Sequence, residues 1–442
     1  MMPEPGTIKA GPEGGVRITT IAWIVTAGMV LLTLDFAPGE VTSQAGERTF
    51  QTGITGSAPA GPANPTTMMN DPAVRDLILA LAGGPVRVAD AERRLDGATY
   101  TPAAIVEAGL ARVEEGRLRL ALNYGSAEDQ RRIAAKASVY GRELGDLILA
   151  RRAAIEAAVR PFAGSADERR AILFFLVGCM ALDWDGLAYT AEKGYRSAAT
   201  VTGPGYAYTP WMKENAPDIS RRGLYWGSHN RAAGAYTFTT FGDHHALPRA
   251  ALPDLFFSLV NPFRGLEGTG AAASGRGLVW AYSPTILSDI ARVLVAIDGG
   301  ARSGDGIAAA SDVAGPTLAS ILTFLERLGY VQQGSEGYSL RVAVLKADAG
   351  PAAARVVALV REAIDVWHQD RADDAARDLA GLTALRQGVP YKVLYSEIWH
   401  YVFGYANLHL SERGLITDPY APSAPFRGFV PVLWDTGIDA SG

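Results

Sequence analysis

The sequence predicts a mainly α-helical fold with small β-ribbons, of the α+β class. In two regions apolar residues follow the i, i+3, i+4, i+7 spacing of a buried helical stripe. Each region ends in a stretch where apolar residues alternate as in a strand, near 118–122 and 338–342. From 183 to 283 helical periodicity largely disappears, and aromatic residues, glycines and prolines accumulate. We therefore predict two helical regions with β-ribbons that flank an irregular or β central region.

The segment from Ile286 to Leu345 gives the clearest pattern. Its longest apolar stripe consists of Leu318, Ile321, Leu322, Leu325 and Leu328. Pro316 favours a helix start and Gly329 a helix end, and the alternating strand follows the turn at 334–337. The stretch GPTLASILTFLERLGYVQQGSEGYSL resembles a winged helix-turn-helix, as in the DNA-binding domains of IclR- and MarR-type bacterial regulators. The resemblance covers residues 284–345, which we call the second copy.

A weaker version of the pattern occupies residues 71–124, which we call the first copy. Its opening helix carries Val74, Leu77, Ile78 and Leu81 and ends at Gly83-Gly84. A short helix is expected near Val88–Leu95, and Thr101-Pro102 then opens a third helix, which Gly109 interrupts. The chain is thus predicted to hold two winged helices that flank the central region.

The N-terminal segment is predicted to direct the protein to or across a membrane. Residues 18–34 carry no charge and approach the minimum length of a membrane-spanning helix. We expect a signal peptide or membrane anchor within 1–45 and a flexible Gly- and Pro-rich linker over 46–70. The folded body would then be exported or anchored in the cytoplasmic membrane. A true start near Met68 would instead leave it cytoplasmic.

The remaining regions are predicted to be mostly helical. In 125–182 we expect a long amphipathic helix over 126–162 and an apolar helix over 166–181. By analogy with winged-helix proteins that dimerise through such helices, we expect a homodimer. The Gly-rich stretch Gly265–Gly277 is interpreted as a flexible connector. The C-terminal region, 346–442, should contain helices over Ala352–Gln369 and Tyr391–Arg413, followed by an extended tail.

The central region (183–283) contains the candidate ligand-binding residues. They are grouped in two nearby stretches: Trp226, His229, Asp243, His244, His245 and Arg249. Histidine beside aspartate suits metal ligation or general acid–base chemistry. Three interpretations remain open: a loop held by local hydrogen bonds, a ligand cleft with aromatic walls, or a catalytic metal site. The cleft would accept a small ligand or a protein partner.

Two further carboxylate–histidine pairs occur in the C-terminal helices. They are Asp365 with His368 and Glu397 with His400, each three residues apart on one helical face. Two such pairs form half of a carboxylate-bridged di-iron site. The additional carboxylates such a site needs are not evident at helical spacing, so coincidence is the preferred interpretation. We predict no cofactor.

Composition and charge bear on the functional class. Of the 442 residues 48% are hydrophobic and 20% charged, which is typical of a globular chain, and the net charge of −5 argues against a protein that coats nucleic acid. The lone Cys179 rules out an intrachain disulfide. The first copy has seven Arg against eight acidic residues, and the second has four against six. We therefore predict a non-enzymatic scaffold or ligand-binding protein. The alternatives are a DNA-binding regulator and a metal-dependent enzyme.

Overall fold

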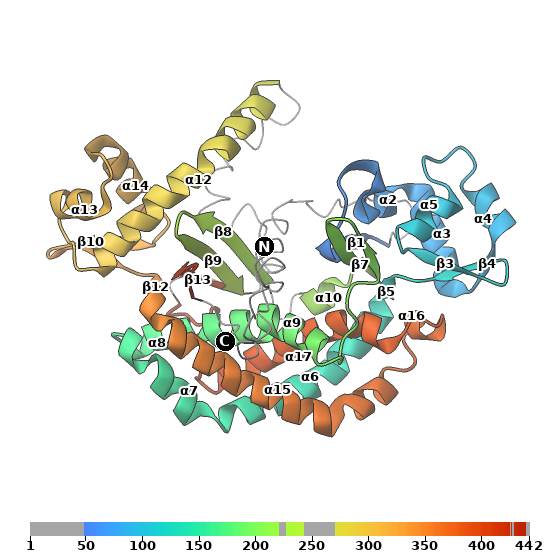
Figure 1. The fold of residues 1–442 in the computed structure, drawn as a ribbon. Coiled ribbons are helices and arrows are strands. Elements are labelled where there is room, and N and C mark those ends of the chain that lie inside the picture. The colour runs from blue at the N-terminus through green and yellow to red at the C-terminus, as the bar shows by residue number, and fades with distance from the viewer. Residues whose placement is uncertain (1–47, 221–226, 243–269, 425, 427, 439–442) are drawn as a thin grey trace, which may run out of the picture. The chain divides into compact units, whose positions relative to one another are not determined.

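The computed structural model describes residues 48–220, 227–242, 270–424, 426 and 428–438 (Figure 1). Helices dominate these residues, and several small sheets lie among them. The prediction of an α+β fold is therefore confirmed at the level of fold class. Residues 18–34 lie outside the described part of the chain.

The first copy consists of short helices and a three-stranded sheet. In chain order its elements are α3 (Pro72–Gly83), β2 (Val86–Arg87), α4 (Val88–Arg94), α5 (Pro102–Glu107), β3 (Ala111–Glu114) and β4 (Arg117–Leu120). Asp71 caps α3 by accepting from the N–H groups of Ala73 and Val74, and the predicted apolar stripe of α3 is buried. The strands pair in the order β2-β4-β3. Strands β3 and β4 form a hairpin, and β2 pairs with the first two residues of β4.

The second copy begins with a longer helix than the sequence suggests. Its elements are α12 (Gly270–Asp298), α13 (Gly304–Ser311), α14 (Gly315–Arg327), β10 (Val331–Gly334) and β11 (Gly337–Leu340). The prediction of a connector over Gly265–Gly277 is wrong from Gly270 onward, because α12 already starts there. The alanines of 271–273 are strong helix formers, but the prediction gave more weight to the many glycines in this stretch.

The two copies share backbone hydrogen bonds at a constant spacing along the chain. Leu110 N–H donates to Ile105 O, and 220 residues later Tyr330 N–H donates to Leu325 O. Ala121 N–H donates to Leu110 O, and Arg341 N–H donates to Tyr330 O in the same relation. Each hairpin continues into a short strand and then a long helix: β5 (Asn123–Gly125) with α6 (Ala127–Leu149), and β12 (Ala343–Leu345) with α15 (Gly350–Asp378). The repeated unit therefore extends beyond the hairpin.

Each of these short strands joins a separate four-stranded sheet. In the first sheet β7 (Tyr206–Glu214) lies between β5, to which it is parallel, and β1 (Phe50–Ser57), and it also pairs with β6 (Val201–Gly203). In the second sheet β13 (Phe429–Asp435) lies between β12, to which it is parallel, and β9 (Tyr236–Gly242), which pairs with β8 (Gly227–Ala233). The C-terminal tail therefore supplies an interior strand.

The predicted linker over 46–70 is wrong wherever the structure describes it. Strand β1 pairs with β7 along its whole length, from Phe50 with Glu214 to Ser57 with Ala207, and η1 (Gly61–Ala63) and α2 (Pro65–Asn70) follow. A Cβ on Gly53 would lie 2.2–2.8 Å from the ring of Trp211. Glycine at this position makes room for an aromatic side chain on the neighbouring strand. Its presence does not indicate a flexible segment.

The remaining helices connect the repeated units. They are α7 (Arg152–Val159), η2 (Arg160–Phe162), α8 (Ala166–Leu173), the π-helix η3 (Phe174–Trp184), α9 (Asp185–Glu192), α10 (Pro217–Ser220), η6 (Ala347–Ala349), α16 (Thr383–Arg386) and α17 (Tyr391–Glu412). The single helix predicted over 126–162 is wrong, because the chain turns at 150–151 between α6 and α7. Among the described residues one helical segment, Ala166–Glu192, has the length and apolarity of a membrane span, and most of it is buried.

Helices α6 and α17 approach closely at Gly141. A Cβ there would lie 2.5 Å from Tyr405 Cβ and 2.6 Å from the carbonyl oxygen of Val402. We expect Gly141→Ala to lower the free energy of unfolding by about 1–3 kcal/mol, because the helices would have to separate. Gly83→Ala in α3, where nothing lies within 4 Å, should raise it by up to about 1 kcal/mol. Urea unfolding of both variants measures these changes, and equal effects would contradict the close crossing.

Candidate functional site

The candidate residues of the central region fall mostly outside the described residues. This applies to Trp226, Asp243, His244, His245 and Arg249. His229 lies in β8, where its backbone pairs with Thr240 of β9. Their convergence on one site therefore stays a prediction.

The Asp365–His368 pair takes part in hydrogen bonds between α9, α15 and α17. Asp365 Oδ2 accepts from Tyr189 Oη at 2.6 Å. His368 Nδ1 donates to the carbonyl of Ile364 at 2.8 Å, which leaves Nε2 to accept from Tyr395 Oη at 2.5 Å. Burial lowers the pKa of His368 to about 4, so the ring is neutral near pH 7. Both ring nitrogens are therefore occupied.

The Glu397–His400 pair takes part in a different set of contacts. Glu397 Oε1 lies 2.6 Å from Lys213 Nζ of β7, and His400 Nδ1 contacts the carbonyl oxygen of Ser396 at 2.5 Å. In the part of the chain that the structure describes, no three His, Cys, Asp or Glu side chains are grouped to hold a metal ion. The contacts of these four residues include hydrogen bonds within and between helices, together with the ion pair to β7.

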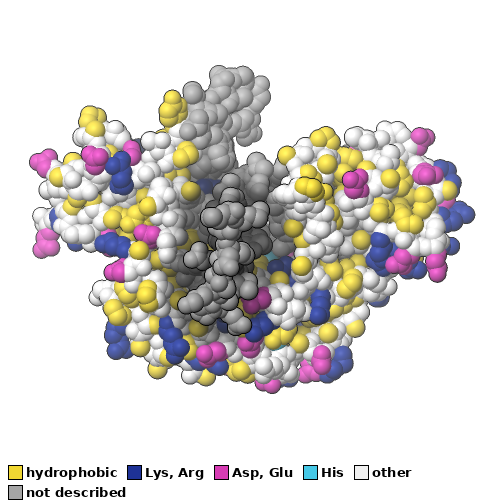
Figure 2. Space-filling model, viewed as in Figure 1, with side chains coloured by type: hydrophobic (Ala, Val, Ile, Leu, Met, Phe, Trp, Pro, Cys, Tyr) yellow, Lys and Arg dark blue, Asp and Glu magenta, His cyan; other side chains and the backbone are white. Residues whose placement is uncertain are grey.

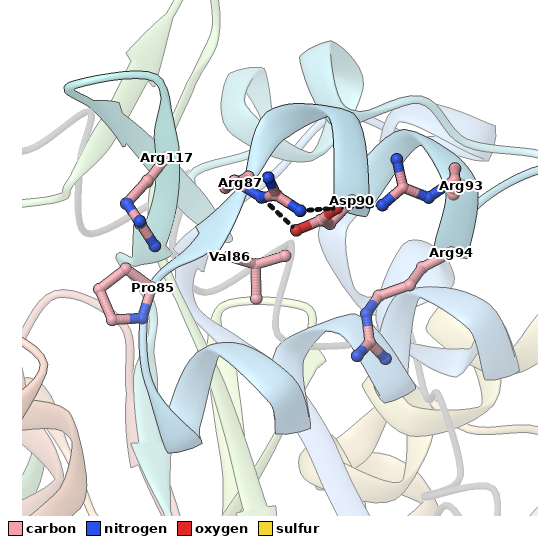
Figure 3. Close-up of a pocket in the computed structure, with 7 residues that line it drawn as sticks. All are labelled: Pro85, Val86, Arg87, Asp90, Arg93, Arg94 and Arg117. Atoms are coloured by element: carbon pink, nitrogen blue, oxygen red, sulfur yellow. Dashed lines mark hydrogen bonds and ion pairs between the residues drawn. The ribbon is translucent and has the colours of Figure 1, made fainter.

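The first copy contains a pocket that sequence reasoning did not single out. It has a volume of about 460 Å³ and is lined by Pro85, Val86, Arg87, Asp90, Arg93, Arg94 and Arg117 (Figure 3). We call it the arginine pocket. Pairing of β2 with β4 places Arg87 opposite Arg117, and α4 starts directly after β2 and brings the other two arginines to the same pocket. Residues thirty positions apart thus meet through the sheet.

The charges of the arginine pocket are unequal. Asp90 accepts from Arg87 Nε at 2.7 Å and Nη2 at 3.0 Å, and it also pairs with Arg93. The hydrogen bond from Arg87 lowers the pKa of Asp90, so this carboxylate is ionised near pH 7. One carboxylate faces four guanidinium groups, which leaves a surplus of three positive charges. Within the described chain neither Arg94 nor Arg117 forms an ion pair.

The second copy has small residues at the positions that correspond to three of these arginines. Buried Ala91 in α4 and buried Ile307 in α13 each occupy the fourth position of their helix. By this correspondence Ala309 and Ala310 replace Arg93 and Arg94. Gly337 stands at the first position of β11, where β4 has Arg117. The described sheet of the second copy has only the two strands β10 and β11, so the pocket is a feature of the first copy.

The positive surplus of the arginine pocket does not appear in the net charge of the whole first copy, which has eight acidic residues against seven arginines. On the face shown in Figure 2, Lys and Arg side chains are interspersed with Asp and Glu. Elsewhere in the copy Glu114 pairs with both Arg112 and Arg119, so its single negative charge offsets one of these two positive charges. The available sequence signal was the run RVADAERR (87–94), with three arginines and two acids in eight residues.

Comparison of the chain with protein-family models, with curated proteins and with solved structures finds no match. The arginine pocket and the repeated unit are thus the observations from which a function can be inferred.

Proposed function

We propose that this protein is a non-enzymatic binding protein built on two winged-helix copies, the first of which binds an anionic ligand in the arginine pocket. The order of helices followed by a hairpin in both copies supports the winged-helix assignment. The surplus of three positive charges in the pocket carries the proposal, because guanidinium binds phosphate and carboxylate groups through paired hydrogen bonds.

The lining of the pocket favours binding over catalysis. Apart from the arginines it contains Pro85, Val86 and Asp90, and the first two offer no group for proton transfer or nucleophilic attack. Asp90 is held by Arg87 and Arg93, and the lowered pKa of its carboxyl makes it a weak base. The arrangement therefore suits recognition of an anion.

Removing Arg94 and Arg117, which form no ion pair with a described residue, tests the proposal. We expect Arg94→Ala/Arg117→Ala to weaken binding of inorganic pyrophosphate by at least about tenfold, because charge-assisted hydrogen bonds are lost. Titration calorimetry of the full chain measures the affinity. Arg327→Ala, an exposed arginine at the end of α14 in the second copy, is the matched control and should leave binding unchanged. Equal affinity in the double variant and the control would refute the assignment.

A DNA-binding regulator is the second candidate. It is favoured by the four arginines of the pocket, because Lys and Arg neutralise the phosphates of nucleic acids. The helices that would enter the groove speak against it: α5 contains no Lys or Arg and ends at Glu107, and α14 contains only Arg327, at its last residue. With few cations at the groove, duplex affinity at physiological salt should be low.

For cellular location we propose export or anchoring in the cytoplasmic membrane through residues 18–34. The uncharged run in these residues is the support for this proposal. Export would place the binding site where it can meet ligands outside the cytoplasm.

A further inference from the structure

We propose that the arginine pocket binds a nucleoside polyphosphate, a compact organic ligand with two or more linked phosphates and a planar ring. This inference rests on the proposed function and specifies its ligand. It follows from the charge of the pocket, the placement of its arginines, its apolar residues and its acidic surroundings.

The charge surplus exceeds what one phosphate neutralises. A single phosphate monoester carries about −1.5 to −2 at neutral pH, which would leave at least one of the three surplus charges uncompensated. Linked phosphates bring a larger negative charge in one molecule. They would compensate the surplus while Asp90 continues to hold Arg87 and Arg93.

The arginines also approach the pocket from different sides. Figure 3 shows Arg117 on one side and Arg94 on the other, with Val86 between them. They come from different elements, β4 and α4. A chain of phosphates can contact both sides at once, because guanidinium groups bind successive phosphates independently.

The apolar part of the pocket suits an organic group. The pocket is open to solvent, and its volume of about 460 Å³ is larger than inorganic phosphate would fill. Pro85 and Val86 are half-buried and offer an apolar surface. A planar ring can lie against that surface and stack on a guanidinium plane.

The surroundings favour a short anion over a long one. Exposed carboxylates lie close to the lining residues in the chain: Glu92, Asp96 and Glu115. A nucleic acid crossing the pocket would bring further phosphates towards these groups, and like charges repel. A ligand whose charge is confined to two or three phosphates avoids this cost.

Titration calorimetry of the full chain in EDTA, with ATP, tripolyphosphate, inorganic phosphate, adenosine and a short DNA duplex, tests the inference. We expect ATP to bind at least about fivefold more tightly than tripolyphosphate, and tripolyphosphate more tightly than phosphate. Val86→Thr keeps the shape of the side chain but makes it polar. It should weaken ATP binding at least about threefold while leaving tripolyphosphate unchanged. Arg94→Ala/Arg117→Ala should weaken both, and Arg327→Ala neither, with circular dichroism confirming that each variant folds.

The outcomes separate the inference from the function on which it rests. Equal affinity for ATP and tripolyphosphate, with loss of both in the double arginine variant, would overturn the nucleoside part and leave the anion site intact. If no anion binds, both proposals fall. If the duplex binds more tightly than ATP with a steep salt dependence, and the double variant abolishes this, the ligand is nucleic acid and the inference is overturned.

Discussion

Replacing Lys213 by methionine is expected to lower the free energy of unfolding by about 3–5 kcal/mol. Lys213 Nζ in β7 lies 2.6 Å from Glu397 Oε1 in α17, and the two side chains are only 15% and 11% exposed. The ammonium group also lies 4.7 Å from the ring centroid of Trp211. Methionine would fill much of the space of the lysine side chain. The Glu397 carboxylate would stay nearly buried but would lose the ammonium group of Lys213. Breaking one half of a buried ion pair costs more than the pair contributes.

Urea unfolding of matched variants distinguishes this effect from a general loss of charge. Lys136→Met removes a lysine that pairs with Asp378 at 2.8 Å, but there the side chains are 44% and 40% exposed, so we expect a change of at most about 1 kcal/mol. The double variant Lys213→Met/Glu397→Gln should recover most of the loss, because no carboxylate remains to be buried. If Lys213→Met is as mild as Lys136→Met, the pair does not behave as a buried one.

Helices could be predicted where apolar residues recur with the helical period, because the same residues form the buried face of the helix. The stripe of Leu318, Ile321, Leu322 and Leu325 is buried in α14, and that of Val74, Leu77, Ile78 and Leu81 in α3. The sheets depend on partners far away in sequence. Phe50 pairs with Glu214, and the tail strand pairs with β9 across almost two hundred residues. No local pattern reports such pairing, so β1 was mistaken for a linker.

The candidate site was missed for a related reason. Histidine and aspartate were selected because they lie close together in sequence and suit metal chemistry. The arginine pocket forms only when β2 pairs with β4, which brings Arg117 to Arg87. Summing charge over the whole first copy also concealed it, because the copy has eight acidic residues against seven arginines. Three arginines in the run 87–94 were visible, but the sequence did not show that they line one pocket together with Arg117.

Asp183→Asn is expected to stabilise the protein at alkaline pH and to have little effect in acid. Asp183 lies in the π-helix η3 and is 6% exposed. Ser228 Oγ donates to its Oδ2 at 3.3 Å and accepts from Trp184 Nε1 at 3.1 Å. Burial raises the pKa of Asp183 to about 7 from an ordinary value of 3.8. Asparagine keeps the size and the acceptor of the neutral carboxyl.

The direction of the pH effect follows from the raised pKa. The Asp183 carboxyl holds its proton more tightly in the folded state than in the unfolded state. The stabilisation that this protonated carboxyl contributes to the fold is complete below about pH 4 and is lost as the pH rises through about 7. The change amounts to roughly 4 kcal/mol at most. Asp183→Asn cannot ionise, so its advantage over the natural protein should grow from near zero at about pH 4 to its full value at about pH 8. Urea unfolding at several pH values measures this difference, and Asp76→Asn at an exposed position of α3 should show no such trend. A difference between the Asp183 variant and the natural protein that stays constant with pH would mean that the carboxyl is ionised in the folded state.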